Sequence, residues 1–297
     1  MDKEKIIKAG KIAGEVKKYA RTIIKKGVPL IEIADKIDNK IKELGAKTGF
    51  PVNLSINEVA AHYTPTADDK TLAHGLLKVD VGISIDGWIA DTAFSLDLED
   101  NEENKKLIQA SQEAVDNAIK IVKSGVTTGE IGKVVQETIE SHGFTPVVNL
   151  SGHEIKQFEI HAGLTIPNIN NKSKDKLSSN SLYAIEPFAT SGQGKIYNGA
   201  DSNIYQIVED KNTRSSTARE ILKFIKQEYY TLPFCSRWIV RKFGAKARFG
   251  LHELEKQGII HHFKQLIEFS GKNVSQAEHT VLIDDKGKVI ITTLEDF

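Results

Sequence analysis

The chain has 297 residues, of which 40% are hydrophobic and 27% charged, a composition typical of a soluble globular protein and not of a disordered one. A chain of this length can bury a large core without disulfides or structural metals. Forty basic and forty acidic residues cancel, so the overall charge gives no indication of a nucleic-acid-binding or membrane-binding protein.

Cysteine content and apolar runs exclude further classes. Cys235 is the single cysteine, so an internal disulfide framework and a cysteine-rich zinc site are excluded. Residues 1–18 alternate charged and apolar side chains and lack the apolar core of a secretory signal. Apolar runs fall short of the roughly 20 residues that a helix needs to cross a bilayer. We therefore expect a cytoplasmic protein that does not bind a membrane.

Two helices are predicted at the start of the chain. Apolar residues recur every three to four positions over 6–23, and Gly27 ends this amphipathic helix. A second helix follows Pro29 and ends before Gly45. Residues 50–56 are then expected to be extended.

This helical unit occurs twice. The residues that end at Gly45 resemble those that end at Gly143, an offset of 98 positions (143 − 45 = 98). Asn-Leu-Ser follows each copy, at 53–55 and at 149–151. We interpret the repeat as a duplicated α/β half, which predicts pseudo-twofold symmetry with a site at the seam. Chance similarity between two helical stretches is the alternative.

Residues 78–96 read as a hairpin around Asp86-Gly87, a strong signal for a two-residue turn. With that turn, Asp80 lies diagonally from Asp91 on the same face. Two buried like charges repel unless cations lie between them, so this pair is a candidate site for two divalent ions. An exposed hairpin face with ordinary surface carboxylates explains the pattern equally well.

Two further carboxylates fall inside apolar stretches. Glu186 is expected in the middle of a strand at 181–190, and Glu278 in the middle of a strand at 276–283. Glutamate is rare in strands and rarely buried without a partner. Taken singly, each is more readily interpreted as a charge on a sheet edge.

Three histidines lie shortly after the two copies of the repeat: His62, His153 and His161. A lone histidine is more often structural than functional, so these are candidates only in combination. We interpret four other histidines as structural residues: His142 at a helix end, and His252, His261 and His262 in the region that follows.

Residues 215–266 differ from the rest of the chain. They are rich in aromatic residues and are predicted to be helical, and positions 211–250 hold ten Lys and Arg against two Glu. Because this stretch interrupts the strand pattern, we interpret it as an inserted helical subdomain. The catalytic domain would then comprise residues 1–214 and 267–297. The basic charge is interpreted first as a solvated face.

Several motifs occur in order along the chain: AAHYTP, KVDVGISIDGWIADTAFS, NLSGHEI with IHAG, AIEPFAT and QAEHTVLI. Together they resemble the type II methionine aminopeptidases of archaea and eukaryotes, over essentially the whole chain. The resemblance implies an α/β (α+β) chain with the pita-bread fold of creatinases and aminopeptidases. That fold has two pseudo-symmetric halves, and type II members carry an inserted helical subdomain similar to a winged helix.

The resemblance also implies a dinuclear metal site. Its ligands would be Asp80, Asp91, His153, Glu186 and Glu278, with Asp91 and Glu278 shared by both ions. Four carboxylates balance two divalent cations. An oxygen-rich set with one imidazole suits Co, Mn, Fe or Zn without selecting among them.

By the same resemblance, a water held between the ions would attack the first peptide bond of a peptide or nascent chain. Glu186 would accept and return its proton, His161 would stabilise the oxyanion, and His62 would assist the leaving amine. Phe50, Ile160 and His161 would line the methionine pocket, where Phe263 would replace a tyrosine.

Such enzymes remove Met before a small second residue. Asp2 therefore predicts that the protein keeps its own Met1, which mass spectrometry of untagged protein would check.

Two alternatives stay open. An Xaa-Pro dipeptidase or aminopeptidase P shares the fold and the metal ligands, although Ala-Gly-Leu follows His161 where those relatives have Glu-x-Pro. A non-catalytic pita-bread binding module would be expected to lack metal ligands. We further expect a monomer, and the alternative role of the basic insertion is a contact with ribosomal RNA through Arg237, Arg241 and Lys242.

Overall fold

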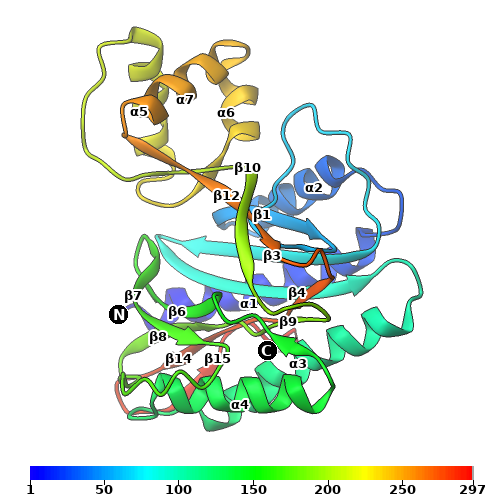
Figure 1. Ribbon diagram of the computed structural model, residues 1–297. Coiled ribbons are helices and arrows are strands. Elements are labelled where there is room, and N and C mark those ends of the chain that lie inside the picture. Colours follow the sequence, from blue (N-terminus) through cyan, green and yellow to red (C-terminus); the bar gives the residue numbers. More distant parts are fainter. Residues whose placement is uncertain (296–297) are drawn as a thin grey trace.

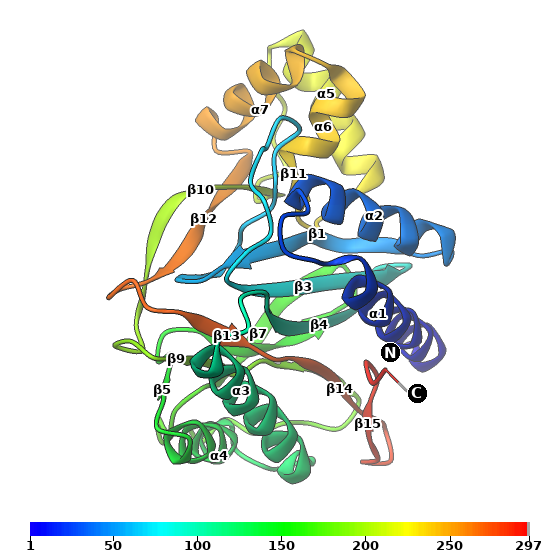
Figure 2. The same cartoon turned by 90° about the vertical axis from the view of Figure 1, so that its right-hand side faces the viewer.

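The computed structural model describes residues 1–295 and has a mixed α/β architecture in which helices cover both sides of antiparallel sheets (Figures 1 and 2). Helices α1 and α2 lie on one side and α3 and α4 on the other, while α5, α6 and α7 form one end of the molecule. Within residues 1–295, no helix is both long and apolar enough to span a bilayer.

The first half consists of two helices on a three-stranded sheet in the order β1-β3-β4. The apolar faces of both helices pack in one continuous core against the face of this sheet that is opposite Asp80 and Asp91. Asp2 caps the first helix by accepting a hydrogen bond from the Lys5 backbone N–H. The elements are α1 (Lys3–Ile23), α2 (Leu30–Glu43), β1 (Lys47–Ile56), β3 (Leu76–Ile85) and β4 (Trp88–Asp97).

The second half repeats this arrangement on a five-stranded sheet in the order β15-β14-β8-β6-β7. Thr127 and Glu130 form a capping box that begins its second helix. The elements are α3 (Glu102–Ile121), α4 (Thr128–Ser141), β6 (Ser151–Lys156), β7 (Glu159–Pro167), β8 (Ser181–Ile185), β14 (His279–Ile283) and β15 (Val289–Ile291).

The element bounds confirm the internal repeat. Helix α4 begins and ends 98 residues after α2 (128 − 30 and 141 − 43). The glycines of both copies have positive φ: 83° at Gly27 and 90° at Gly125, and 75° at Gly45 and 78° at Gly143. These backbone conformations suit glycine, so the same turn chemistry recurs. The second Asn-Leu-Ser differs, because it leads into β6 whereas the first lies inside β1.

The two long strands expected around Glu186 and Glu278 are each broken. Strand β8 ends at Ile185 and β9 (Phe188–Thr190) begins after Pro187, while β13 (Val274–Gln276) and β14 are separated by Ala277 and Glu278. Strand β9 pairs with β13 on one side and with β5 (Thr145–Pro146) on the other, in a different sheet. Proline cannot donate to a ladder, so the chain leaves one sheet for the other at this point. The mid-strand predictions for both glutamates were therefore wrong.

A fourth sheet, in the order β11-β10-β12-β2, connects the helical end to the rest. Helices α5, α6 and α7 share a hydrophobic core with apolar residues of these strands. The prediction that 215–266 is helical was wrong for its last residues, which belong to β12. The elements are β2 (Val59–Ala61), β10 (Ile196–Ile207), α5 (Ser216–Glu228), β11 (Phe234–Cys235), α6 (Ser236–Phe243), α7 (Lys246–Lys256) and β12 (Ile260–Glu268).

The basic residues of α6 are largely engaged with α2. Arg237 is fully buried and pairs with Asp38 at 2.9 Å and with Asp35 at 3.3 Å. Both terminal nitrogens of Arg241 donate to the two carboxylate oxygens of Asp35 at 2.6 Å. The interpretation of Arg237 as a surface contact for ribosomal RNA was wrong, because the positive charge serves a contact between α6 and α2.

Candidate metal centre

Most of the candidate site residues line one cavity of about 340 Å³ between the two halves. Strands of both sheets and of the β10–β12 sheet contribute to its walls. Of the nine candidates, eight line it: Phe50, His62, Asp80, Asp91, His153, Ile160, His161 and Glu186. The ninth, Glu278, reaches the same place through its carboxylate, which lies among the metal-ligating atoms.

The hairpin has the predicted register. Gly82 pairs with Asp91, and Asp80 pairs with Ala93. Asp86 and Gly87 both have positive φ, 50° and 84°, as a two-residue turn of the primed type requires. Asp80 and Asp91 are thus diagonal neighbours on the face that lines the cavity.

The second half supplies the other three polar ligand candidates. His153 on β6 places its Nε2 3.6 Å from Asp91 Oδ2 and 3.5 Å from Glu186 Oε1. Donor atoms of Asp91, His153 and Glu278 all lie within 4.8 Å of one another. Glu186 and Glu278 sit at the two strand breaks, which lie side by side because Ala277 N–H donates to the Pro187 carbonyl. All five residues therefore converge.

Burial and mutual repulsion disfavour the ionised form of the four carboxyl groups. Burial raises the pKa of Asp80 to about 7. Burial, and then the charges of the neighbouring carboxylates, raise the pKa of Asp91, Glu186 and Glu278 well above their usual range. Among the residues described, the buried oxygens Asp80 Oδ1, Asp91 Oδ1 and Glu278 Oε1 have no hydrogen-bond partner.

A divalent metal fits this set. Four buried carboxylates require positive charge, and the oxygens without partners are the donors that a cation would bind. Burial also lowers the pKa of His153 to about 3, so its imidazole is neutral and has a lone pair for a metal. Oxygen donors with one imidazole are compatible with several first-row divalent metals.

Two further histidines lie above the carboxylates. The ring of His161 on β7 meets that of His153 edge to face, with centroids 4.5 Å apart. His62 follows β2 with a positive φ of 66°, and its Nδ1 is 3.3 Å from the Lys264 carbonyl oxygen. Desolvation in the cavity lowers the pKa of His62 to about 4 and also lowers that of the partly exposed His161, so both imidazoles are mainly neutral at pH 7.

The remaining wall of the cavity is apolar. Phe50 and Ile160 are buried and belong to one core cluster. Phe263 on β12 closes this wall and packs edge to face against His62, with ring centroids 5.5 Å apart. The cavity thus combines an acidic, metal-ligating part with a place for an unbranched apolar side chain.

Sequence reasoning missed Gln276. Its Nε2 lies 3.5 Å from both Glu186 Oε2 and Glu278 Oε2, so the amide links two ligand candidates. Gln276 stands two positions before Glu278 in an extended stretch, and that period-2 spacing was the available signal. Asn53, which pairs with Asp80 in the β1–β3 register and lines the cavity, was also missed as a site residue.

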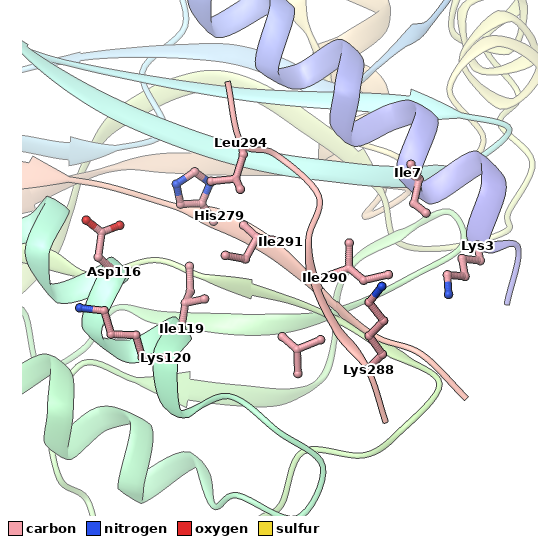
Figure 3. A pocket seen from close by; sticks show the side chains of 11 residues that line it. Lys3, Ile7, Asp116, Ile119, Lys120, His279, Lys288, Ile290, Ile291 and Leu294 are labelled. Atoms are coloured by element: carbon pink, nitrogen blue, oxygen red, sulfur yellow. The ribbon is translucent and has the colours of Figure 1, made fainter. Parts of the chain in front are cut away.

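A larger cavity of about 970 Å³ lies on the other side of β14 and β15, next to α1 and α3 (Figure 3). Six of its eleven lining residues are isoleucine, valine or leucine, and Lys3, Lys120 and Lys288 are also among them. Among the residues described, His279 contributes the one imidazole of its lining, and the nine candidate site residues lie elsewhere. The chemistry is therefore assigned to the smaller cavity.

Comparison with known proteins agrees with the geometry. The profile of metallopeptidase family M24 matches residues 4–284. The methionine aminopeptidase of Pyrococcus abyssi is 44% identical over 297 residues, which cover 99% of this chain and all of that protein. That of Methanocaldococcus jannaschii is 41% identical over 291 residues, or 97% of this chain and 98% of that protein.

Solved structures share the fold. A thermophilic Arx1 superposes with a TM-score of 0.83 at 14% identity, covering 97% of this chain and 90% of that one. The methionine aminopeptidase of Thermotoga maritima gives 0.70 at 22% identity, covering 98% and 96%. Prolidase from Pyrococcus furiosus gives 0.62 at 18% identity and covers 98% of this chain but 63% of its own.

Proposed function

The chain belongs to metallopeptidase family M24, and on this basis we propose that it is a methionine aminopeptidase. It would remove the N-terminal Met from peptides and nascent proteins whose second residue is small. The observation that carries this proposal is the buried set of four carboxylates and one neutral imidazole in a cavity with an apolar wall.

We propose that two divalent ions, of Co, Mn, Fe or Zn, are held by five side chains: Asp80, Asp91, His153, Glu186 and Glu278. Burial disfavours the ionised form of all four carboxylates. Two divalent cations would balance their four negative charges. When bound, such ions supply Lewis acidity, which polarises a carbonyl and acidifies a water at neutral pH.

The side chains around this set would move the protons. Glu186, at the strand break, faces the cavity and would take a proton from the attacking water and return it to the leaving amine. His161 would donate a hydrogen bond to the developing oxyanion, and His62 would contact the leaving nitrogen. Both imidazoles are neutral at pH 7, so each can donate a proton in a hydrogen bond without adding positive charge beside the cations.

Selectivity for methionine would come from the apolar wall. Phe50, Ile160 and Phe263 surround a space that suits an unbranched thioether side chain, together with the ring of His161. A charged side chain there would be desolvated without a partner, and its burial would cost free energy.

An Xaa-Pro dipeptidase is less well supported. Relatives from three archaea that match 97–99% of this chain at 40–44% identity are named methionine aminopeptidases. The chain spans 63% of the P. furiosus prolidase, and at 18% identity that likeness concerns the fold. A non-catalytic binding module would have no need of five converging ligand candidates.

We also propose the division into a catalytic domain (1–214 and 267–297) and an inserted helical subdomain (215–266). The separate hydrophobic core of α5, α6 and α7 supports this division, with the later residues of the range in β12. A cytoplasmic monomer remains our proposal for the state in which the protein acts.

The test is direct. Protein stripped with a chelator is assayed with the peptides Met-Ala-Ser and Leu-Pro after Mn, Co, Fe or Zn is restored. Metal-dependent release of free Met, lost in Glu186→Ala and reduced in His62→Ala, is expected. Cleavage of Leu-Pro in place of Met-Ala-Ser would assign the protein to the prolidases, and turnover of neither would refute the proposed activity.

A further inference from the structure

The seam beside β4 carries an unusual set of hydrogen bonds. Strand β4 is the edge of the β1-β3-β4 sheet, and it lies against β13 and β14, which belong to two other sheets. The sheet ladder does not continue across this seam among the described residues, although the Glu278 N–H donates to the Ala93 carbonyl at 3.0 Å. Other groups must therefore satisfy the buried backbone of β4.

Thr280 of β14 satisfies both backbone groups of Asp91. Its Oγ1 accepts from the Asp91 N–H at 2.8 Å and donates to the Asp91 carbonyl oxygen at 2.7 Å. Both residues are buried, and Thr280 has no exposed surface. One hydroxyl thus holds a ligand candidate of the first half from a strand of the second half, 189 positions away.

Two other hydroxyls bond to backbone groups across the seam, and one of them, that of Ser95, repeats the full arrangement. Ser95 Oγ accepts from the Gln276 N–H at 2.9 Å and donates to the Gln276 carbonyl at 2.8 Å. Thr92 Oγ1 donates to the Glu278 carbonyl at 2.8 Å. A hydroxyl is suited to this task because it donates and accepts at once, as a backbone N–H or carbonyl alone does not.

The position of these bonds relates them to the ligands. Asp91 and Glu278 come from opposite sides of the seam, and their donor atoms lie within the same 4.8 Å cluster. Without a continuous ladder, no regular pairing fixes the distance between them. The hydroxyl bonds of Thr280 and Thr92, together with the single backbone bond from the Glu278 N–H to Ala93, tie the backbones of these two residues together.

We propose that Thr280 is a positioning residue of the metal centre: its hydroxyl holds Asp91 at the spacing from Glu278 that lets both carboxylates bind the metal ions. This inference rests on the proposed function for its biological meaning, but it concerns metal affinity and can be tested apart from catalysis.

The test compares Mn²⁺ binding by isothermal titration calorimetry in matched variants. Thr280→Val keeps the side-chain shape and removes both hydrogen bonds, and Thr280→Ser keeps the hydroxyl. Thr190→Val is the control, because Thr190 is equally buried and its Oγ1 also accepts from an N–H (Gly192, 3.0 Å) and donates to a carbonyl (Asn273, 2.8 Å). Thermal melts of the metal-free proteins report the stability of each fold.

Supporting groups around a metal ligand typically change metal affinity about 10- to 100-fold when they are removed. We expect Thr280→Val to lose Mn²⁺ affinity by at least about 10-fold, on that basis. Thr280→Ser should stay close to the wild type, and Thr190→Val should lose thermal stability with an unchanged Mn²⁺ affinity. If Thr280→Val does not fold, Thr280→Ala takes its place, because it removes the same two hydrogen bonds to Asp91 and leaves a smaller side chain.

Wild-type Mn²⁺ affinity in folded Thr280→Val, or in Thr280→Ala where that variant replaces it, would overturn the inference. An equal loss of affinity in Thr190→Val would also overturn it, since the effect would then reflect general loosening. These outcomes are separate from the proposed function. If the wild type releases no Met from Met-Ala-Ser while Thr280→Val alone loses Mn²⁺ affinity, the activity is refuted and the positioning role stands.

Discussion

Replacing Arg237 with alanine is expected to destabilise the protein strongly. Arg237 has no exposed surface, and its guanidinium donates to Asp38 Oδ2 at 2.9 Å, to the Pro65 carbonyl at 2.8 Å and to Thr64 Oγ1 at 3.2 Å. It connects α6 with α2 and with the segment that follows β2. Removing it takes these bonds from the Pro65 carbonyl and Thr64 Oγ1, and it leaves the buried Asp38 carboxylate with Trp238 Nε1 as a donor but without its cationic partner.

The size of the effect follows from the burial of the pair. The loss of one partner from a buried ion pair costs about 3–5 kcal/mol. Arg241, which pairs with Asp35, provides the internal comparison because its side chain is 46% exposed. Exposed pairs contribute about 0–1 kcal/mol, so Arg241→Ala should cost far less.

The pH dependence adds a second observable. Burial raises the pKa of Asp38, while the charge of Arg237 opposes this rise. A carboxyl group whose pKa is raised in the folded state lowers the stability of the protein as the pH rises through that pKa. Arg237→Ala raises the pKa of Asp38 further. The loss in free energy of unfolding of this variant, relative to the wild type, should therefore be smaller at pH 5 than at pH 7.

Urea unfolding followed by circular dichroism at both pH values measures these differences as changes in the free energy of unfolding. The expected order is wild type, then Arg241→Ala, then Arg237→Ala, with a gap of more than about 2 kcal/mol between the two variants at pH 7. Equal losses in the two variants, or a loss below about 1 kcal/mol for Arg237→Ala, would refute the reasoning from burial.

Three more predictions follow from individual side chains. Burial lowers the pKa of Lys17 to about 8, so the wild type should gain stability between pH 8 and 10 as this lysine loses its charge. Lys17→Met should be more stable than the wild type at pH 7, by up to about 3 kcal/mol. In urea titrations, this variant should lack the gain between pH 8 and 10. A Cβ on Gly82 would lie 2.4 Å from the Phe50 ring, so Gly82→Ala should displace this wall and raise KM for Met-Ala-Ser several-fold with little change in Mn²⁺ affinity; an unchanged KM would contradict the placement of Phe50. Because burial raises the pKa of Asp80 to about 7, Mn²⁺ binding at pH 7 should release protons, and binding heats should therefore differ between buffers of different ionisation enthalpy.

The hairpin shows which part of the site could be predicted from the sequence. Side chains alternate along a strand and a two-residue turn fixes the register, so the shared face of Asp80 and Asp91 follows from local rules. The internal repeat could also be predicted from the sequence, because the same glycine turns recur at one offset. The pattern left open whether this face was exposed or buried, since burial depends on the strands of the second half.

The predictions failed where the chain changes sheets. The stretches around Glu186 and Glu278 have strand composition, and nothing in their alternation reveals the breaks. Pro187 was the available signal, because it cannot donate to a ladder. The ion pairs of Arg237 could not be predicted for a different reason. Its acidic partners lie on α2, roughly 200 positions earlier, and local sequence composition does not reveal such long-range contacts.

The strand breaks also explain why the ligands can meet. Within a regular sheet, a carboxylate points to one face and its neighbours on adjacent strands lie at fixed spacings. Glu186 and Glu278 lie outside the ladders, so their orientation is free of that constraint and both turn toward the hairpin carboxylates. The same freedom removes the pairing that would hold them in place. Side-chain hydroxyls and the amide of Gln276 supply it instead, which is why we expect Mn²⁺ affinity to respond to Thr280 as well as to the ligands themselves.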